Sequence, residues 1–318
     1  MNGWIILDKP VGLGSTQAVA AVKRVCREAG LGKVKVGHGG TLDPLASGVL
    51  PIALGEATKL CGRMLDASKV YEFTVQFGTE TAGLDAEGEV VAASDVRPTL
   101  AEVEAVLPRF TGPIEQVPPA YSAIKIDGQR AYDRARAGEN VEMKARAVTI
   151  HSLRHAGLDP ASIAPDEEWT PDQVRGDEAE EARLASITLT AHVSKGTYIR
   201  SLARDIARAA GTVGHVTMLR RTKAGPFDLR QAISLDKLNA FGQGAAKSDI
   251  ILPLEAGLVD IPALNLSPEA AGAIRQGRVW TGESTHDGLY WGRDADSRPV
   301  ALIEALAGTL KVVRGFNI

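Results

Sequence analysis

The segment at residues 37–51, GHGGTLDPLASGVLP, constrains the fold more than any other part of the sequence. Three glycines in four positions surround His38, and glycine tolerates backbone angles that other residues resist, so the whole segment is predicted to be a shaped loop. Proline pushes the residue before it towards an extended conformation, so Asp43, which precedes Pro44, is expected on a fixed backbone. The apolar run at 49–54 predicts a buried strand or helix below it. An Asx-type turn that caps local backbone explains the same residues equally well.

The chain has 318 residues, which is enough for a main domain and a smaller one. Its hydrophobic content of 44% is typical of soluble globular proteins, and no apolar run approaches the roughly 20 residues that span a membrane. The N-terminus lacks the basic segment of a signal peptide. Cys26 and Cys61 match no metal-ligand spacing and no disulfide framework. Together these features indicate a cytoplasmic protein without a membrane partner.

The charge of the chain is segregated along the sequence. The formal net charge is −3, but residues 157–184 contain nine acids and two arginines, so the rest of the chain carries +4. We interpret residues 157–184 as an acidic surface insertion, because they are also poor in apolar side chains. Residues 195–225 contain seven basic side chains and one acid. They predict a basic patch that suits phosphates.

Apolar and polar residues alternate at 70–77 and 186–193, which predicts two half-buried strands. Residues 79–89 are polar and show no cation-ligand spacing, so we expect a solvated loop there. A helix is predicted to follow the second strand, with Arg200, Arg204 and Arg208 along one face. Other expected elements are a strand at 4–7, a helix from Ser15 or Thr16 to Gly30, a helix at about 100–107, a short strand and turn within 117–128, a strand at 215–221 and short strands from about residue 252.

Five segments resemble the TruB family of bacterial tRNA pseudouridine synthases, which modify the uridine at position 55 in the T loop of tRNA. They occur in the family's order and cover most of the chain. In chain order they are LDKPVG, GHGGTLDPLASGVLPIALGEATKL, PPAYSAIKIDGQRAYDRARAG, SKGTYIRSLARD and GHVTMLRRTKAG. The chain departs from the family in two places: Gly39 stands where a threonine is usual, and the acidic insertion is longer.

The resemblance implies an α+β fold, with a mixed, largely antiparallel sheet flanked by helices. It implies a pseudouridine synthase catalytic domain at 1–250 and a small β-rich, PUA-like RNA-binding domain at 251–318. The implied partner is the T stem-loop of tRNA, and the family suggests a monomer with no obligate protein partner. Isomerisation oxidises nothing and adds nothing, so no redox cofactor, nucleotide or metal is expected.

The resemblance also implies roles for individual residues. Asp43 matches the catalytic aspartate, and Arg200 matches the cation that favours its charged form. His38 matches the residue that helps to extrude the nucleotide, since chemistry on a stacked base requires flipping it out. Taken alone, each of the non-catalytic positions is at least as typical of a structural residue. The positions that match the family's base-binding pocket are Tyr71, Tyr198 and Leu219.

The same sequence features are compatible with two other functions. The basic patches and the C-terminal segment also suit a non-catalytic RNA-binding or tRNA-folding protein. An unrelated hydrolase could use Asp43 with a metal ion, but the sequence places no second carboxylate or histidine pair near it.

Overall fold

The computed structural model describes residues 1–122, 124–139, 141–156, 182–242, 250–282 and 285–318. These residues form two compact units: unit 1 joins residues 1–66 to 223–318, and unit 2 is residues 67–222. The predicted domain boundary after residue 250 differs from this division and stays a prediction. Most of the predicted acidic insertion lies outside the described residues, but its last residues do not. Leu184 is fully buried, so the predicted end of the insertion is wrong.

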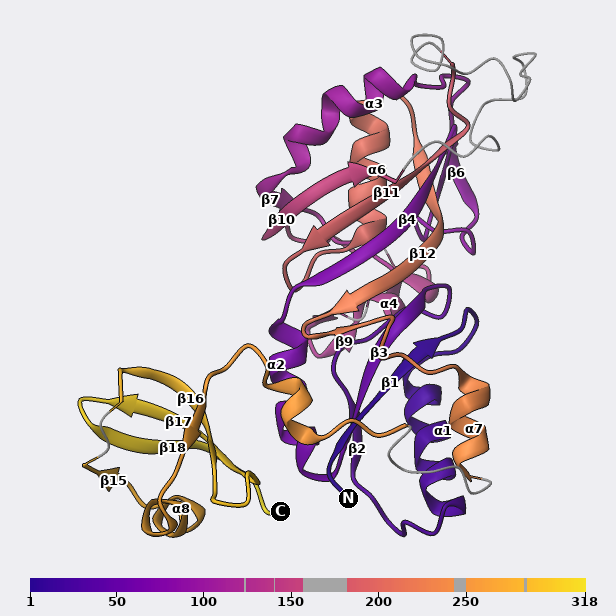
Figure 1. The fold of residues 1–318 in the computed structure, drawn as a ribbon. Coiled ribbons are helices and arrows are strands. Elements are labelled where there is room, and N and C mark those ends of the chain that lie inside the picture. The colour runs from indigo at the N-terminus through magenta and orange to yellow at the C-terminus, as the bar shows by residue number, and fades with distance from the viewer. Residues whose placement is uncertain (123, 140, 157–181, 243–249, 283–284) are drawn as a thin grey trace, which may run out of the picture. The chain divides into compact units, whose positions relative to one another are not determined.

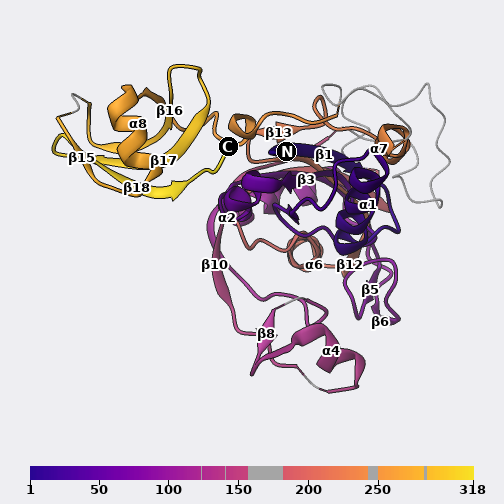
Figure 2. The same cartoon turned by 90° about the horizontal axis from the view of Figure 1, so that it is seen from below.

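Unit 2 is built around five paired strands with helix α6 packed on one face. Its elements are β4 (Lys69–Phe77), β5 (Thr79–Thr81), β6 (Val90–Ala93), α3 (Leu100–Val106), η2 (Leu107–Phe110), β7 (Gly112–Gln116), β8 (Lys125–Ile126), β9 (Gln129–Arg130), α4 (Ala131–Arg136), β10 (Arg146–His155), β11 (Ser186–Val193), α6 (Ile199–Ala209) and most of β12 (Gly214–Ala224). The strand order is β12-β4-β11-β10-β7, and the pairs β4–β11, β11–β10 and β10–β7 are antiparallel. Both views show α6 against one face of these strands (Figure 1, Figure 2).

The alternation of apolar and polar residues along β4 explains how the core of unit 2 forms. Phe73, Val75 and Phe77 point to one face of β4 and are buried against apolar side chains of α6, as the alternating pattern predicts. In α6 the apolar stripe of Ile199, Leu202 and Ile206 faces this core. Burying side chains of this size contributes about 1.5–3 kcal/mol each, which fixes α6 on the sheet.

Unit 1 contains two groups of paired strands. Its elements are β1 (Gly3–Lys9), α1 (Ser15–Glu28), β2 (Val36–His38), β3 (Ser47–Leu54), η1 (Gly55–Leu60), α2 (Cys61–Asp66), β13 (Phe227–Asp228), α7 (Leu235–Gly242), η5 (Leu254–Gly257), β14 (Ala263–Asn265), α8 (Pro268–Arg275), β15 (Trp280–Thr281), β16 (Gly288–Arg293), β17 (Pro299–Leu306) and β18 (Thr309–Gly315). Strand β3 pairs antiparallel with β1 along the whole of β1, and β2 pairs with the other edge of β3. Helices α1 and α7 lie side by side in both views (Figure 1, Figure 2).

The C-terminal residues form a separate small sheet in the order β14-β16-β17-β18-β15. Its strands pair antiparallel except for β14 and β16, which are parallel. Helix α8 packs on it through Ala270, Ala271 and Ile274. The expected α+β fold, with a largely antiparallel sheet flanked by helices and a β-rich C-terminal part, is confirmed.

Candidate active site

The loop that carries Asp43 is shorter than predicted. Residues at both ends of the 37–51 segment belong to strands, because Gly37 and His38 pair with β3 and β3 itself begins at Ser47. Only residues 39–46 connect the two strands. The two ends of this loop are therefore fixed by ladders of backbone hydrogen bonds, and Asp43 lies near its centre with a half-buried side chain.

Hydrogen bonds fix the backbone on both sides of Asp43. The hydroxyl of Ser15, in the first turn of α1, accepts from Leu42 N at 2.8 Å and donates to Leu42 O at 2.9 Å. On the other side, Pro44 O accepts from Gly12 N at 2.8 Å. A side chain that satisfies both backbone groups of one residue leaves that residue little freedom. The carboxylate of Asp43 is thus presented from a preorganised backbone.

Close packing against Met64 explains why residue 39 is glycine. A Cβ on Gly39 would lie 2.5 Å from Met64 Cβ and 2.9 Å from Met64 Cγ, far closer than side chains approach one another. The Gly39 N–H donates to Pro51 O at 2.8 Å, which continues the pairing beyond β2. Glycine at this position therefore makes room for Met64 of α2, and its backbone is bonded. The adjacent His38 is half-buried, and its Nδ1 accepts from Gly40 N at 3.4 Å.

Arg200 is buried in unit 2 and donates hydrogen bonds to two other segments of this unit. Its Nη1 donates to Gly83 O at 2.8 Å and to Asp85 Oδ2 at 3.0 Å, and its Nη2 donates to Tyr121 O at 3.0 Å. The whole residue is 7% exposed. A charged, forked donor with these acceptors has one orientation, so α6 and the segments around Gly83 and Tyr121 are joined at this guanidinium.

The prediction of a solvated loop at 79–89 is wrong. Strands β5 and β6 form a hairpin there, and its acids pair with arginines of α6. Asp85 pairs with Arg200, while Glu80 accepts from Arg208 at 2.7 and 3.2 Å. The sequence analysis did not predict the pairing of Asp85 with Arg200. A signal was present, because arginines repeated on a helix with an apolar stripe require buried acceptors.

The other predicted residues lie in unit 2 as well. Tyr71 in β4 and Leu219 in β12 are half-buried and pack against the core of this unit. Tyr198 directly precedes α6, and the guanidinium carbon of Arg146 lies 4.8 Å from the centre of its ring, a cation–π distance. The backbone of Tyr198 also donates to Gln116 Oε1 at 2.8 Å. Unit 2 thus contains four of the predicted residues, Tyr71, Tyr198, Arg200 and Leu219, whereas Asp43 and His38 belong to unit 1.

Two further arginines were expected to present a basic face to phosphate. Arg204 is largely buried, with 13% of its side chain exposed, and its Nη2 donates to Val117 O at 3.3 Å. Arg208 is more exposed, but Glu80 accepts two hydrogen bonds from it. The predicted strand at 215–221 continues to Ala224 as β12, so Arg220 and Arg221 lie within the strand rather than at its end.

Groups of metal-ligating side chains and reactive thiols were also sought among the described residues. None of these residues forms a group of three or more histidine, cysteine or acidic side chains that could hold a metal ion. Burial raises the pKa of both thiols, Cys26 and Cys61, so they stay protonated and are poor nucleophiles at neutral pH. No helix within the described ranges is long and apolar enough to cross a membrane.

Two family models match consecutive parts of the chain. A family model described as "TruB family pseudouridylate synthase (N terminal domain)" matches residues 27–199. A second, described as "tRNA pseudouridylate synthase B C-terminal domain", matches residues 200–259. The protein named tRNA pseudouridine synthase B of Novosphingobium aromaticivorans is 66% identical over 318 residues, which cover 100% of this chain and 98% of the relative. The protein of the same name from Zymomonas mobilis is 55% identical over 317 residues, with 100% of this chain and 96% of the relative covered.

Solved structures resemble the chain at lower identity. A chain of an H/ACA RNP bound to a substrate RNA containing 2'-deoxyuridine superposes with a TM-score of 0.69 at 23% identity, covering 99% of this chain and 85% of the other. A chain of a Cbf5-Nop10-Gar1 complex gives a TM-score of 0.69 at 24% identity, with 99% and 85% covered. At this level of identity the likeness shows the fold alone.

Proposed function

Because the chain belongs to the TruB family of pseudouridylate synthases, we infer that it isomerises uridine to pseudouridine in tRNA, at position 55 of the T loop. The observation that carries this inference is the identity of 66% across the whole chain with a protein named tRNA pseudouridine synthase B. The match covers 100% of this chain, so it includes both units.

The bonds that break and form in this isomerisation determine what the site must provide. The bond between N1 of uracil and C1′ of ribose breaks, and a bond between C5 and C1′ forms. C5 loses its hydrogen as a proton, and N1 gains one, so the atoms and electrons balance without an added reactant. The protein must supply an ionised carboxylate near the ribose or base, a pocket that retains the freed uracil, and access to a base that is stacked in folded RNA.

We propose Asp43 as the catalytic carboxylate. Support comes from its position in the family's sequence pattern and from the hydrogen bonds of Leu42 and Pro44, which fix the backbone on either side of it. A fixed carboxylate avoids reorganisation during the reaction, which is the main means by which a site of this kind lowers a barrier. His38, the last residue of β2 before the same loop, is proposed to contact the RNA and to help extrude the nucleotide.

In unit 2 we propose Tyr71, Tyr198, Arg200 and Leu219 as the residues that receive the nucleotide. Arg200 keeps the role that the family pattern gives it, as the cation of the site, and Asp85 acts through it as a positioning residue. This role of Asp85 rests on its hydrogen bond of 3.0 Å to the Arg200 guanidinium. Replacing one partner of a buried pair leaves the other charge uncompensated, so Asp85 matters even without touching RNA.

We further propose that residues 251–318 are an RNA-binding domain of the PUA type, and that the protein acts on the T stem-loop as a monomer in the cytoplasm. The exposed arginines Arg130 and Arg136, near Tyr132, are placed to add electrostatic affinity for the RNA backbone. Neither acts on the uridine itself.

Tritium release tests the function and the role of Asp43 together. A T stem-loop RNA with tritium at C5 of uridine should lose its label to water when the wild-type protein acts on it. Asp43→Asn should lower the rate by roughly 10²–10⁴-fold while RNA affinity stays near that of the wild type. The matched control is Asp95→Asn, an exposed carboxylate of unit 2, which should release label at the wild-type rate. No release by the wild type would refute the isomerase, whereas equal release by Asp43→Asn would remove Asp43 from its role.

A further inference from the structure

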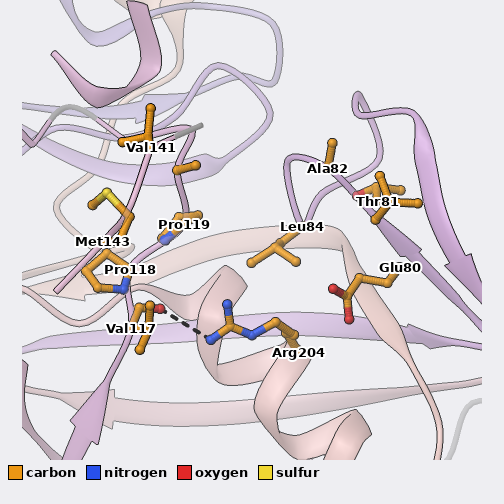
Figure 3. A pocket seen from close by; sticks show the side chains of 12 residues that line it. Glu80, Thr81, Ala82, Leu84, Val117, Pro118, Pro119, Val141, Met143 and Arg204 are labelled. Atoms are coloured by element: carbon orange, nitrogen blue, oxygen red, sulfur yellow. Dashed lines mark hydrogen bonds between the residues drawn. The ribbon is translucent and has the colours of Figure 1, made fainter. Parts of the chain in front are cut away.

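Unit 2 contains a pocket that none of the six predicted site residues lines (Figure 3). Its volume is about 250 Å³, below the roughly 300–1,000 Å³ of cavities for drug-sized ligands, so it admits a single small ring system. Most of its wall is apolar, formed by side chains of the β5–β6 hairpin, of the segment at 117–120 and of Val141 and Met143. An apolar wall of this kind suits the apolar face of a small ring.

Two charged groups contribute to the lining of this pocket. The Nε and Nη2 of Arg204 donate to Asp205 Oδ1 and Val117 O, whereas its Nη1 has no acceptor among the described residues. Figure 3 shows the Arg204 guanidinium between the side chains of Val117 and Leu84, with the Glu80 carboxylate nearby. The side chain of Arg204 is only 13% exposed, so its spare N–H groups are held in place rather than moving in solvent. The pocket therefore offers fixed donors from Arg204 and acceptor lone pairs from Glu80.

Leu84 lines the pocket with a strained backbone. Its φ is +61°, in the left-handed region that glycine occupies freely and a leucine does not. Its N–H donates to Thr81 O at 3.0 Å, and its carbonyl accepts from Val216 N at 3.1 Å, so the conformation is enforced from both sides. Strain of this kind persists where the surroundings impose it, and it concentrates at ligand sites.

The pocket is one residue away from the groups that orient Arg200. Leu84 precedes Asp85, and Ala120 precedes Tyr121, and both Asp85 and the Tyr121 carbonyl accept from Arg200. Beside the apolar wall, Lys144 follows Met143 and is exposed. A nucleotide whose base entered the pocket could thus place its phosphate towards a cation.

We propose that this pocket binds one unpaired nucleobase of the substrate RNA other than the target uridine. Unstacked bases are bound between apolar surfaces and are read along their edges by hydrogen bonds, and each base edge presents donors and acceptors together. Arg204 and Glu80 supply the matching pair. The inference rests on the proposed function, since it takes the T stem-loop as the substrate.

The test is a binding cycle with abasic RNA. T stem-loops that already carry pseudouridine at the target position are made with one loop nucleotide at a time lacking its base. Dissociation constants are measured for the full-length wild type and for Arg204→Met. One abasic position should weaken wild-type binding about tenfold or more, the size of one bound base, and the same position should cost Arg204→Met little. Arg183→Met, which removes an exposed arginine of unit 2 outside the pocket, should keep the full abasic loss.

A second pocket variant, Met143→Ala, is included because Arg204→Met could lose its effect on binding through misfolding. Met143→Ala truncates a half-exposed apolar wall and should reduce the abasic loss at the same position. If every abasic position weakens the wild type and both pocket variants alike, the inference is overturned. Conversion of unmodified RNA to pseudouridine by the same preparations is measured in parallel. If the wild type converts the RNA but the pocket variants keep the full abasic loss, only the pocket inference is refuted. If the wild type does not convert the RNA, the proposed function is refuted.

Discussion

Gly39 and Met64 are predicted to be coupled through their Cβ positions. An alanine Cβ at residue 39 would lie 2.5 Å from Met64 Cβ, whereas ordinary contact begins at 3.4 Å. Helix α2 and the loop would have to separate by about 0.9 Å, the difference between these distances. Met64 is 2% exposed and packs in the core of unit 1, so this movement disturbs a close-packed interior. We expect Gly39→Ala to destabilise unit 1 by about 1–3 kcal/mol, the usual effect of overpacking.

Two substitutions of Met64 differ in whether the Cβ that meets residue 39 remains. Met64→Ala leaves a Cβ in place, so Gly39→Ala should remain destabilising in that background and the two changes should be roughly additive. Met64→Gly removes the Cβ and should relieve the clash, with a favourable coupling of about 1–2 kcal/mol. Met64→Gly alone should be the least stable single variant, since it combines a lost core side chain, about 2–5 kcal/mol, with about 1 kcal/mol for glycine in a helix.

Native-state hydrogen exchange measures this coupling where it acts. Peptides that cover residues 36–40 and 61–66 report the free energy of local opening, and urea unfolding of the same variants reports global stability. Equal coupling in the alanine and glycine backgrounds would show that a flexible part of Met64 yields instead of the backbone. No coupling in either would refute the packing explanation for Gly39. Tritium release then shows whether a displaced loop also slows the reaction.

Two further predictions concern hydrogen bonds within unit 1, those of Ser15 and those of Glu56. Ser15→Ala removes the hydrogen-bond partner of both backbone groups of Leu42, so it should destabilise the folded protein by about 1–3 kcal/mol. It should also lower kcat for tritium release more than it lowers RNA affinity. An unchanged kcat would show that other contacts hold the loop. Burial would raise the pKa of Glu56, but hydrogen bonds from Asn317 N and Lys59 outweigh it and lower the pKa. Its stabilisation is then present above the unfolded pKa of about 4.3 and lost as the pH falls through the folded value, so the wild type should lose its advantage over Glu56→Gln in urea unfolding between about pH 6 and pH 3.

Strands and helices with strong local patterns were predictable. The alternation at 186–193 coincides with β11, and that at 70–77 with β4, because one face of each strand is buried. The helix expected after Ser15 runs to Glu28 as α1, with its apolar stripe inward. Short or irregular strands such as β7 and β10 were not predicted, since β10 contains a bulge that breaks the alternation.

The partners of buried charges were not predictable from local sequence. Asp85 and Arg200 are 115 residues apart, and a polar stretch around an acid looks the same whether it is solvated or paired. Arg221 is 1% exposed within β12, although adjacent arginines suggested the end of a strand. Glycine signals were similarly ambiguous: Gly39 indicated backbone freedom, yet its cause is the side chain of Met64. Such contacts require knowledge of which segments meet in space.

Unit 1 is assembled from both ends of the chain, which sets the order of events during synthesis. Strand β1 leaves the ribosome first, but the indole of Trp4 donates to Leu254 O, at a sequence separation of 250 residues. At about 5–20 residues per second, translation takes roughly 12–50 s to supply that acceptor. Residues 67–222, which form a continuous unit, are complete earlier. Trp4 therefore lacks this partner until the chain has been made as far as Leu254, whereas the contacts of Ser15 and Gly12 with the loop need only the first 66 residues and can form before the rest of unit 1 arrives.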